Sequence, residues 1–131
     1  MKKILLMTFV ALMAFATSSC VDEHEDYTIT WGSEVYGDLT PEVKEAWTYL
    51  DEVFDETFQN SGYEVMSGTM VLRDSNMKKA SKVAQDLANR ADSKVDRSKI
   101  EVLKTTKNAT MRVRVHGTET QTAWEKDYAK E

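Results

Sequence analysis

The segment from Met111 to Gly117, MRVRVHG, alternates apolar residues with two arginines and a histidine. Successive side chains of a β-strand point to opposite faces of the sheet, so Arg112, Arg114 and His116 would share one face. Guanidinium groups hold carboxylates and phosphates through paired hydrogen bonds, so the row is a candidate site for an anionic ligand or a partner. Two alternatives remain. The row could be a solvated face whose charges oppose edge-to-edge pairing, or the protein's own carboxylates could neutralise it.

His116 is the residue of this row that could handle a proton, and it is the sole histidine after residue 26. A small hydrolase, or an enzyme inhibitor, would need a nucleophile or carboxylate within about 3 Å of its ring. The sequence contains no nucleophile-elbow motif, no glycine-rich phosphate loop and no metal-ligand signature. We therefore expect a protein without catalytic activity, cofactor or metal, and the alternative is a hydrolase or enzyme inhibitor that uses His116.

Four aromatic residues lie outside the strongest apolar patterns: Trp31, Tyr36, Trp124 and Tyr128. Exposed aromatic rings can stack on sugars or anchor a protein partner, so Trp31 and Trp124 are further candidates for binding. The alternative is that these rings fill the seam between helices and sheet.

The N-terminus carries two lysines, an apolar run from Ile4 to Ala16, three small residues and the single cysteine, Cys20. The apolar run is shorter than the roughly 20 residues that a membrane-spanning helix needs. A positive start, a short apolar middle and small residues before a cleavage site are typical of a secretory signal peptide over residues 1–19. One cysteine also excludes an intrachain disulfide.

The stretch ending at Cys20 resembles the lipobox of bacterial lipoproteins, in a relaxed form because Thr17 stands where the usual box has leucine. The resemblance implies that Cys20 is acylated and becomes the new N-terminus. Several fatty chains, such as palmitate, would then anchor the protein stably in a membrane. The alternative is an ordinary signal peptide with an incidental cysteine.

An acidic cluster, residues 22–26, follows the cysteine. It resembles the surface-export signal of Bacteroidota lipoproteins, which implies a lipid-anchored protein exposed on the outer-membrane surface. A location facing the periplasm is the alternative. A run of like charges also suits a solvated, extended tether over residues 20–26.

The remaining residues, 27–131, suffice for one small domain. The first 19 residues hold two of the 17 lysines and arginines and none of the 22 acidic residues, so residues 20–131 have a formal charge of −7. Nucleic acid is an unsuitable partner for such a chain, because it requires a basic surface.

Hydrophobic periodicity predicts a strand at 27–31, a loop at 32–38, and a helix that starts at Pro41, is capped by Thr40 and ends at 60–62. It further predicts an interior strand at 63–72, with a bulge or a close packing contact at Gly68, and a helix at 77–91. Strands at 100–104 and 109–117 would form a hairpin, and 119–130 would be a short helix or a frayed tail.

We expect the strand at 27–31 to lie at an edge. The predicted fold is an α+β two-layer sandwich, with a mixed sheet of about four strands and two or three helices packed on one face. The expected function is that of a lipid-anchored, non-catalytic binding module with a protein or glycan partner.

Overall fold

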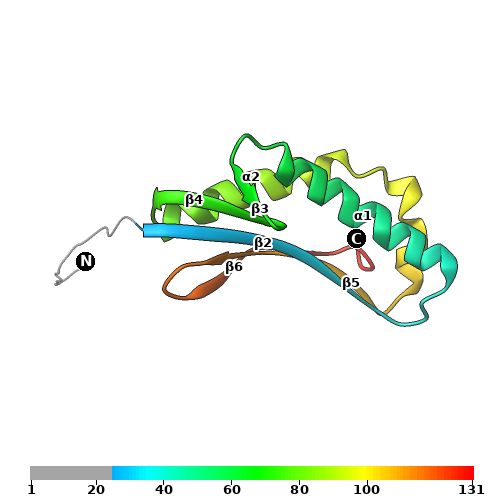
Figure 1. The fold of residues 1–131 in the computed structure, drawn as a ribbon. Coiled ribbons are helices and arrows are strands. Elements are labelled where there is room, and N and C mark those ends of the chain that lie inside the picture. Colours follow the sequence, from blue (N-terminus) through cyan, green and yellow to red (C-terminus); the bar gives the residue numbers. More distant parts are fainter. Residues whose placement is uncertain (1–24) are drawn as a thin grey trace.

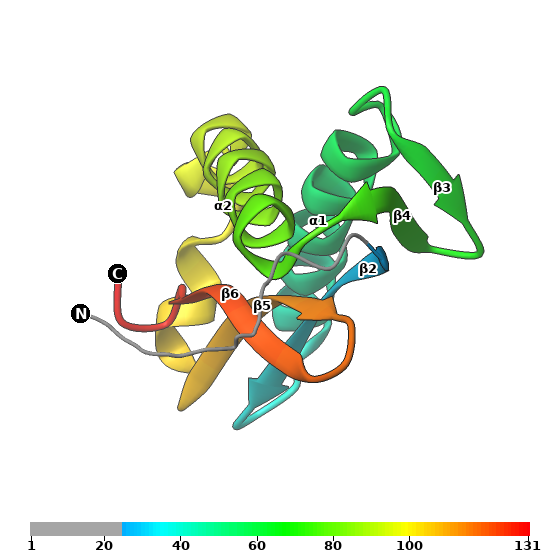
Figure 2. The ribbon, with the colours of Figure 1, turned by 90° about the vertical axis from the view of Figure 1, so that its left-hand side faces the viewer.

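The computed structural model describes residues 25–131. The predicted signal peptide, Cys20 and most of the tether lie outside the described residues. One layer is a sheet. The other holds two helices, α1 (Pro41–Gln59) and α2 (Met77–Lys94), which cover the same face of that sheet (Figures 1 and 2). The predicted two-layer α+β sandwich is confirmed. None of the helices in residues 25–131 is long and apolar enough to cross a membrane.

The sheet has five strands in the order β3-β4-β2-β5-β6, and all neighbouring strands are antiparallel. It is therefore not the mixed sheet of about four strands that the sequence predicts. The strands are β2 (Glu25–Tyr36), β3 (Glu64–Met66), β4 (Thr69–Ser75), β5 (Asn108–His116) and β6 (Thr120–Asp127).

Strand β2 lies at the centre of the sheet, whereas the sequence predicts an edge strand that ends before Gly32. It begins at Glu25, inside the predicted tether, and runs through Gly32 to Tyr36. A glycine weakens a strand, but Gly32 is held because it pairs with Arg112 of β5. Residues 32–36 of the predicted loop at 32–38 are thus part of the longest strand.

Helix α1 (Pro41–Gln59) begins as predicted, with the Thr40 hydroxyl accepting a hydrogen bond from the Val43 N–H at 3.2 Å. Helix α2 (Met77–Lys94) begins with Asn76, whose side chain accepts from the Lys79 N–H at 2.9 Å. The buried face of α2 is made mainly of alanines, so this helix lies close to its neighbours. These alanines are Ala80, Ala84, Ala88 and Ala91.

The predicted interior strand at 63–72 is instead a hairpin of β3 and β4. Ser67 and Gly68 form its two-residue turn with φ of 53° and 76°. Positive φ at both central residues is what a tight hairpin turn requires, so Gly68 marks a turn and not a bulge.

Two other predictions in the C-terminal third are wrong. Residues 100–104 are not a strand, because this region forms two short 3-10 helices, η1 (Arg97–Lys99) and η2 (Glu101–Thr105). They bury Ile100 and Leu103, which are three residues apart. Residues 119–130 contain strand β6, which takes the place in the hairpin with β5 that the sequence assigns to 100–104.

Candidate functional site

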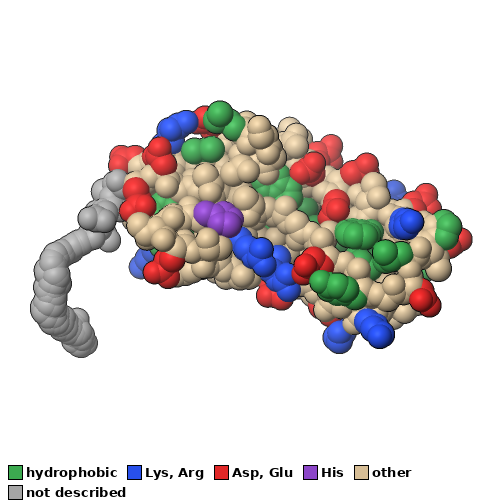
Figure 3. Space-filling view, turned by 60° about the horizontal axis from the view of Figure 1, so that its bottom comes forward, with side chains coloured by type: hydrophobic (Ala, Val, Ile, Leu, Met, Phe, Trp, Pro, Cys, Tyr) green, Lys and Arg blue, Asp and Glu red, His purple; other side chains and the backbone are tan. Residues whose placement is uncertain are grey.

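The basic row lies on the face of the sheet turned away from the helices, here called the open face. Residues Met111, Val113 and Val115 are fully buried against the helices. Arg112 and His116 are partly exposed and Arg114 is exposed. Figure 3 shows this face, with the histidine beside a row of basic side chains and acidic groups flanking it. The predicted alternation is therefore present in the structure, while a binding role stays a prediction.

Strand pairing places each basic residue between one residue of β2 and one of β6. Arg112 lies between Gly32 and Glu125, Arg114 between Thr30 and Thr122, and His116 between Thr28 and Thr120. Directly opposed residues of neighbouring strands project from the same face of the sheet. The surroundings of the three basic groups therefore differ, and so does their freedom to bind.

Arg112 is occupied by the protein's own carboxylates. It donates to Glu34 Oε1 at 2.8 Å and to Glu125 Oε2 at 3.2 Å. The hydrogen bond from Arg112 lowers the pKa of Glu34. For Arg112, the alternative that the protein's own carboxylates neutralise the basic row is therefore correct.

His116 is held between two threonine hydroxyls. Its Nε2 lies 2.8 Å from Thr30 Oγ1, and its Nδ1 lies 3.0 Å from Thr120 Oγ1. A hydroxyl thus lies within the distance that a nucleophile would need. Within residues 25–131, no carboxylate hydrogen-bonds the ring to orient it as a base, which the Ser-His-Asp arrangement requires.

Arg114 is the group of the row that is free to bind. Within residues 25–131 its guanidinium makes no hydrogen bond or ion pair, and Glu34 acts on it only as a nearby charge. Beside it is a hollow of about 230 Å³, lined by residues 30–34, Arg112 and Arg114. The space at Gly32 is open, since an added Cβ there would meet no atom within 4 Å. The sequence alone did not indicate a role for Gly32, which reads there as the end of a strand.

Tyr36 stands at the far end of β2 on the same face and is 56% exposed. Its hydroxyl makes a long hydrogen bond to Glu34 Oε2 at 3.4 Å. Of the four aromatic candidates, Tyr36 is the one that shares the open face with the arginines.

The two candidate tryptophans lie on the opposite, helix-covered side. Trp31 stacks on Phe58 with ring centroids 4.6 Å apart, and its Nε1 donates to Asp55 at 2.7 Å. Trp124 tilts against Phe54 at 5.6 Å and donates to an asparagine of α2. The structure therefore does not bring Trp31 and Trp124 together with the arginine row, and both fill the seam between helices and sheet.

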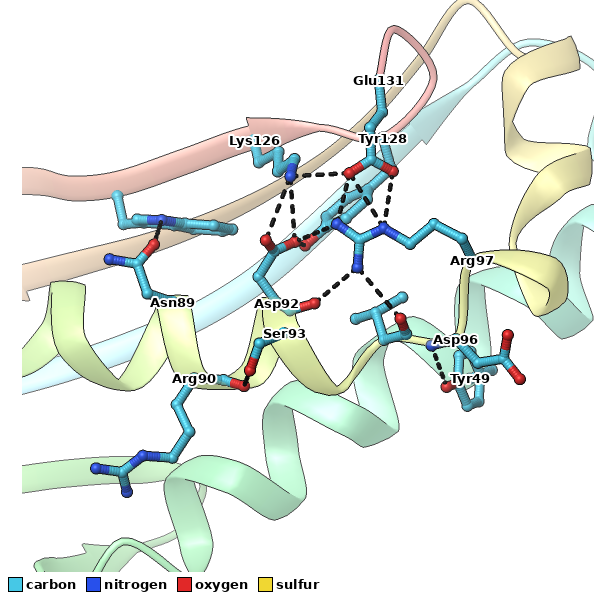
Figure 4. A network of polar contacts seen from close by, with 12 residues as sticks. Tyr49, Asn89, Arg90, Asp92, Ser93, Asp96, Arg97, Lys126, Tyr128 and Glu131 are labelled. Carbon is cyan, nitrogen blue, oxygen red and sulfur yellow. Dashed lines mark hydrogen bonds and ion pairs between the residues drawn. The ribbon is translucent and has the colours of Figure 1, made fainter.

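A polar network, which no sequence pattern predicts, connects the end of the chain to α2 (Figure 4). Asp92 accepts hydrogen bonds from Tyr128, Arg97 and Lys126. Glu131 pairs with the same arginine and lysine. Burial alone would raise the pKa of Asp92, but its three hydrogen bonds together lower it. Burial and the carboxylate of Asp92 raise the pKa of Tyr128.

This network is a structural clamp and not a second binding site. Tyr128 is buried, and each charged side chain in the network has a partner of opposite charge. Charges satisfied in this way have little left to offer a ligand. The open face is therefore the stronger candidate.

Comparisons of this chain with protein-family models, with curated proteins and with solved structures find no match.

Proposed function

We propose that this protein is a lipid-anchored component of the cell envelope whose domain acts as a non-catalytic binding module. Acyl chains on Cys20 hold it at the outer membrane, and the open face of the sheet takes a protein or glycan partner. The observation that supports binding is Arg114, whose guanidinium makes no hydrogen bond or ion pair within the described chain, beside the hollow at Gly32.

Support for the anchor comes from the sequence: a positive start, a short apolar run, small residues and then Cys20. Glu25, the first residue of β2, lies five positions after Cys20. A fully extended chain over five positions spans at most about 18 Å, so the domain would stay close to the membrane that holds the lipid. We propose display on the outer surface, and a periplasm-facing position is the alternative.

A second candidate function is a small hydrolase, which the 2.8 Å separation of Thr30 Oγ1 and His116 Nε2 favours. This pair lacks an orienting carboxylate, so we rank it below binding. If the pair is catalytic, Thr30→Val and His116→Gln should each abolish any ester hydrolysis shown by the purified protein. Hydrolysis that survives both substitutions would remove this candidate.

The experiment that tests the binding function compares partner capture by two arginine variants. The anchored protein is crosslinked in intact cells and its attached neighbours are identified. Arg114→Gln on the open face should lose the neighbours that the unaltered protein captures. Arg90→Gln, an exposed arginine on α2, is the matched control and should keep them. Equal capture by both variants would contradict a role for the open face.

A further inference from the structure

The geometry points to an acidic carbohydrate as the ligand of the open face. Arg114 would hold a carboxylate of the sugar chain over the hollow at Gly32, and Tyr36 would pack against a sugar ring. This inference rests on the proposed binding function and names the class of ligand for the same surface.

The first observation is that most arginines of the open face are already paired with carboxylates. Arg112 is bridged by Glu34 and Glu125, and Arg73 of β4 is bridged by Glu64 at 2.9 Å and Asp26 at 3.3 Å. The pairing of these two arginines leaves Arg114 as the guanidinium of this face whose donors are free, within the described chain. A guanidinium with free donors can grip a carboxylate through two parallel hydrogen bonds.

The neighbours of Arg114 suit a polyhydroxyl ligand. Thr30 and Thr122 flank it across the sheet, and their hydroxyls both donate and accept hydrogen bonds. They do not neutralise the guanidinium, so they leave its charge available. A sugar acid presents a carboxylate with hydroxyls around it, which matches this arrangement.

The second step is the hollow beside Arg114. Glycine in the interior of a strand is unfavourable and often marks a place where a ligand comes close to the backbone. The backbone of Gly32 does not have the positive φ that would demand a glycine, and a Cβ there would meet nothing within 4 Å. Neither the backbone conformation nor the packing around residue 32 requires a glycine. What the glycine does provide is open space beside Arg114.

The third step is the exposed aromatic ring at the end of the same strand. From Gly32 to Tyr36 the strand advances four residues, or about 13 Å. A ring that is more than half exposed offers an apolar platform, and sugar rings have an apolar face that packs on it. The separation of the two contacts fits an oligosaccharide better than a single sugar.

The same surface is poorly suited to other macromolecules. A protein interface is centred on buried apolar and aromatic anchors, whereas threonines, charged groups and glycine make up the area around Arg114. Glu34 and Glu125 flank the arginines and would repel the closely spaced phosphates of nucleic acid. A glycan with one carboxylate per two sugars, such as hyaluronan, can place that carboxylate on Arg114 and present uncharged hydroxyls to Glu34 and Glu125.

The test uses the purified full-length protein, titrated by calorimetry with trigalacturonate and with a hyaluronan tetrasaccharide. The ligand control is trigalacturonate with its carboxylates methyl-esterified, and inorganic phosphate is a further probe. We expect at least one acidic oligosaccharide to bind and the esterified one to bind at least tenfold more weakly. Arg114→Gln should reduce affinity at least tenfold and Tyr36→Ala severalfold, while Arg90→Gln should leave it unchanged.

Gly32→Val is the sharpest variant, because valine favours strands and its side chain has room. It should fill the hollow and weaken binding at least tenfold without lowering the melting temperature. Full binding by Gly32→Val or by Arg114→Gln would overturn the inference. So would binding of phosphate with no tighter binding of either sugar acid, or no binding by the unaltered protein.

These outcomes separate the ligand from the broader function. If neither sugar acid binds but crosslinked partners depend on Arg114, the carbohydrate inference fails and the binding module remains. If Arg114→Gln also leaves partner capture unchanged, both the carbohydrate inference and the proposed binding function of the open face fail.

Discussion

The phenol of Tyr128 donates a hydrogen bond to Asp92 Oδ1 at 2.5 Å, which joins the segment after β6 to helix α2. The bond lies in a region where Tyr128 is 1% exposed. Removing this hydrogen bond therefore tests how much it contributes to holding the two layers of the fold together.

Tyr128→Phe keeps the ring and removes this hydrogen bond. Asp92 still has Arg97 and Lys126 as partners, so we expect a loss of about 1–2 kcal/mol in the free energy of unfolding, measured by urea denaturation. Tyr63→Phe, at an exposed tyrosine, is the matched control and should change little. Equal stability of the two variants would show that the clamp contributes nothing.

The pKa of Glu131 is lowered by its hydrogen bond from Arg97, so its contribution to stability depends on pH. The ordinary pKa of a glutamate is 4.5, and a lowered folded-state pKa gives stability that is present above this value and is lost as pH falls through the folded-state pKa. Glu131→Gln should therefore be less stable than the unaltered protein at pH 7, and the difference should shrink below pH 4.5. Denaturation at several pH values checks this, and a constant difference would contradict it.

Asp51 should behave in the opposite way. Burial raises its pKa above the ordinary aspartate value of 3.8, although a hydrogen bond from Ser33 opposes this change. A raised carboxyl pKa means that the folded state binds the proton more tightly, so stability falls as pH rises above 3.8. Asp51→Asn keeps an acceptor for Ser33 and should stabilise the protein at pH 7 but not at low pH. The neighbouring Glu52→Gln is the control, and the melting temperature of each is the measurement.

Trp31 lies in the seam between helix and sheet, so its removal should affect folding before binding. Trp31→Ala loses the stacked contact with Phe58 and the hydrogen bond to Asp55, and we expect a cost of about 3 kcal/mol. Tyr36→Ala, on the open face, should leave the melting temperature nearly unchanged. A larger loss of stability for Tyr36→Ala than for Trp31→Ala would show that these aromatic residues have been assigned the wrong roles.

The proposed anchor predicts that Cys20→Ser is released from membranes, because serine offers no sulfur for acylation. Cell fractionation should find it in the soluble fraction, and labelled palmitate should not be incorporated. Ser19→Ala retains a small residue before the cysteine and should remain membrane-bound. Cys20→Ser that sediments with membranes as before would contradict the anchor.

The sequence predicted those elements whose local signals agree with one another. Thr40 and Pro41 locate the start of α1, and the alternation around Val113 locates β5 and its basic face. The elements that were predicted wrongly contain sequence patterns that point to a different structure from the one they form. Residues 100–104 contain branched apolar residues typical of strands, but Ile100 and Leu103 are buried three residues apart in a 3-10 segment. Strand β6 is polar because it lies at an edge, and periodicity is weak there.

The candidate site was predictable only in part. Alternation alone put Arg112, Arg114 and His116 on one face, but it could not tell which of them would be neutralised. That depends on Glu34 and Glu125, which come from two other strands. The hollow at Gly32 follows from the pairing register of β2 with β5, and no local pattern in the sequence encodes it.

The central position of β2 has a consequence for how the chain reaches its native state. This strand pairs with β5, and contacts such as that between Thr30 and His116 join residues 86 positions apart. Pairings between such distant parts of a chain form slowly, because a long loop must close first. During synthesis the middle of the sheet cannot assemble until almost all of the polypeptide has emerged. For the proposed export through a secretion channel, which takes an unfolded chain, that delay would be an advantage.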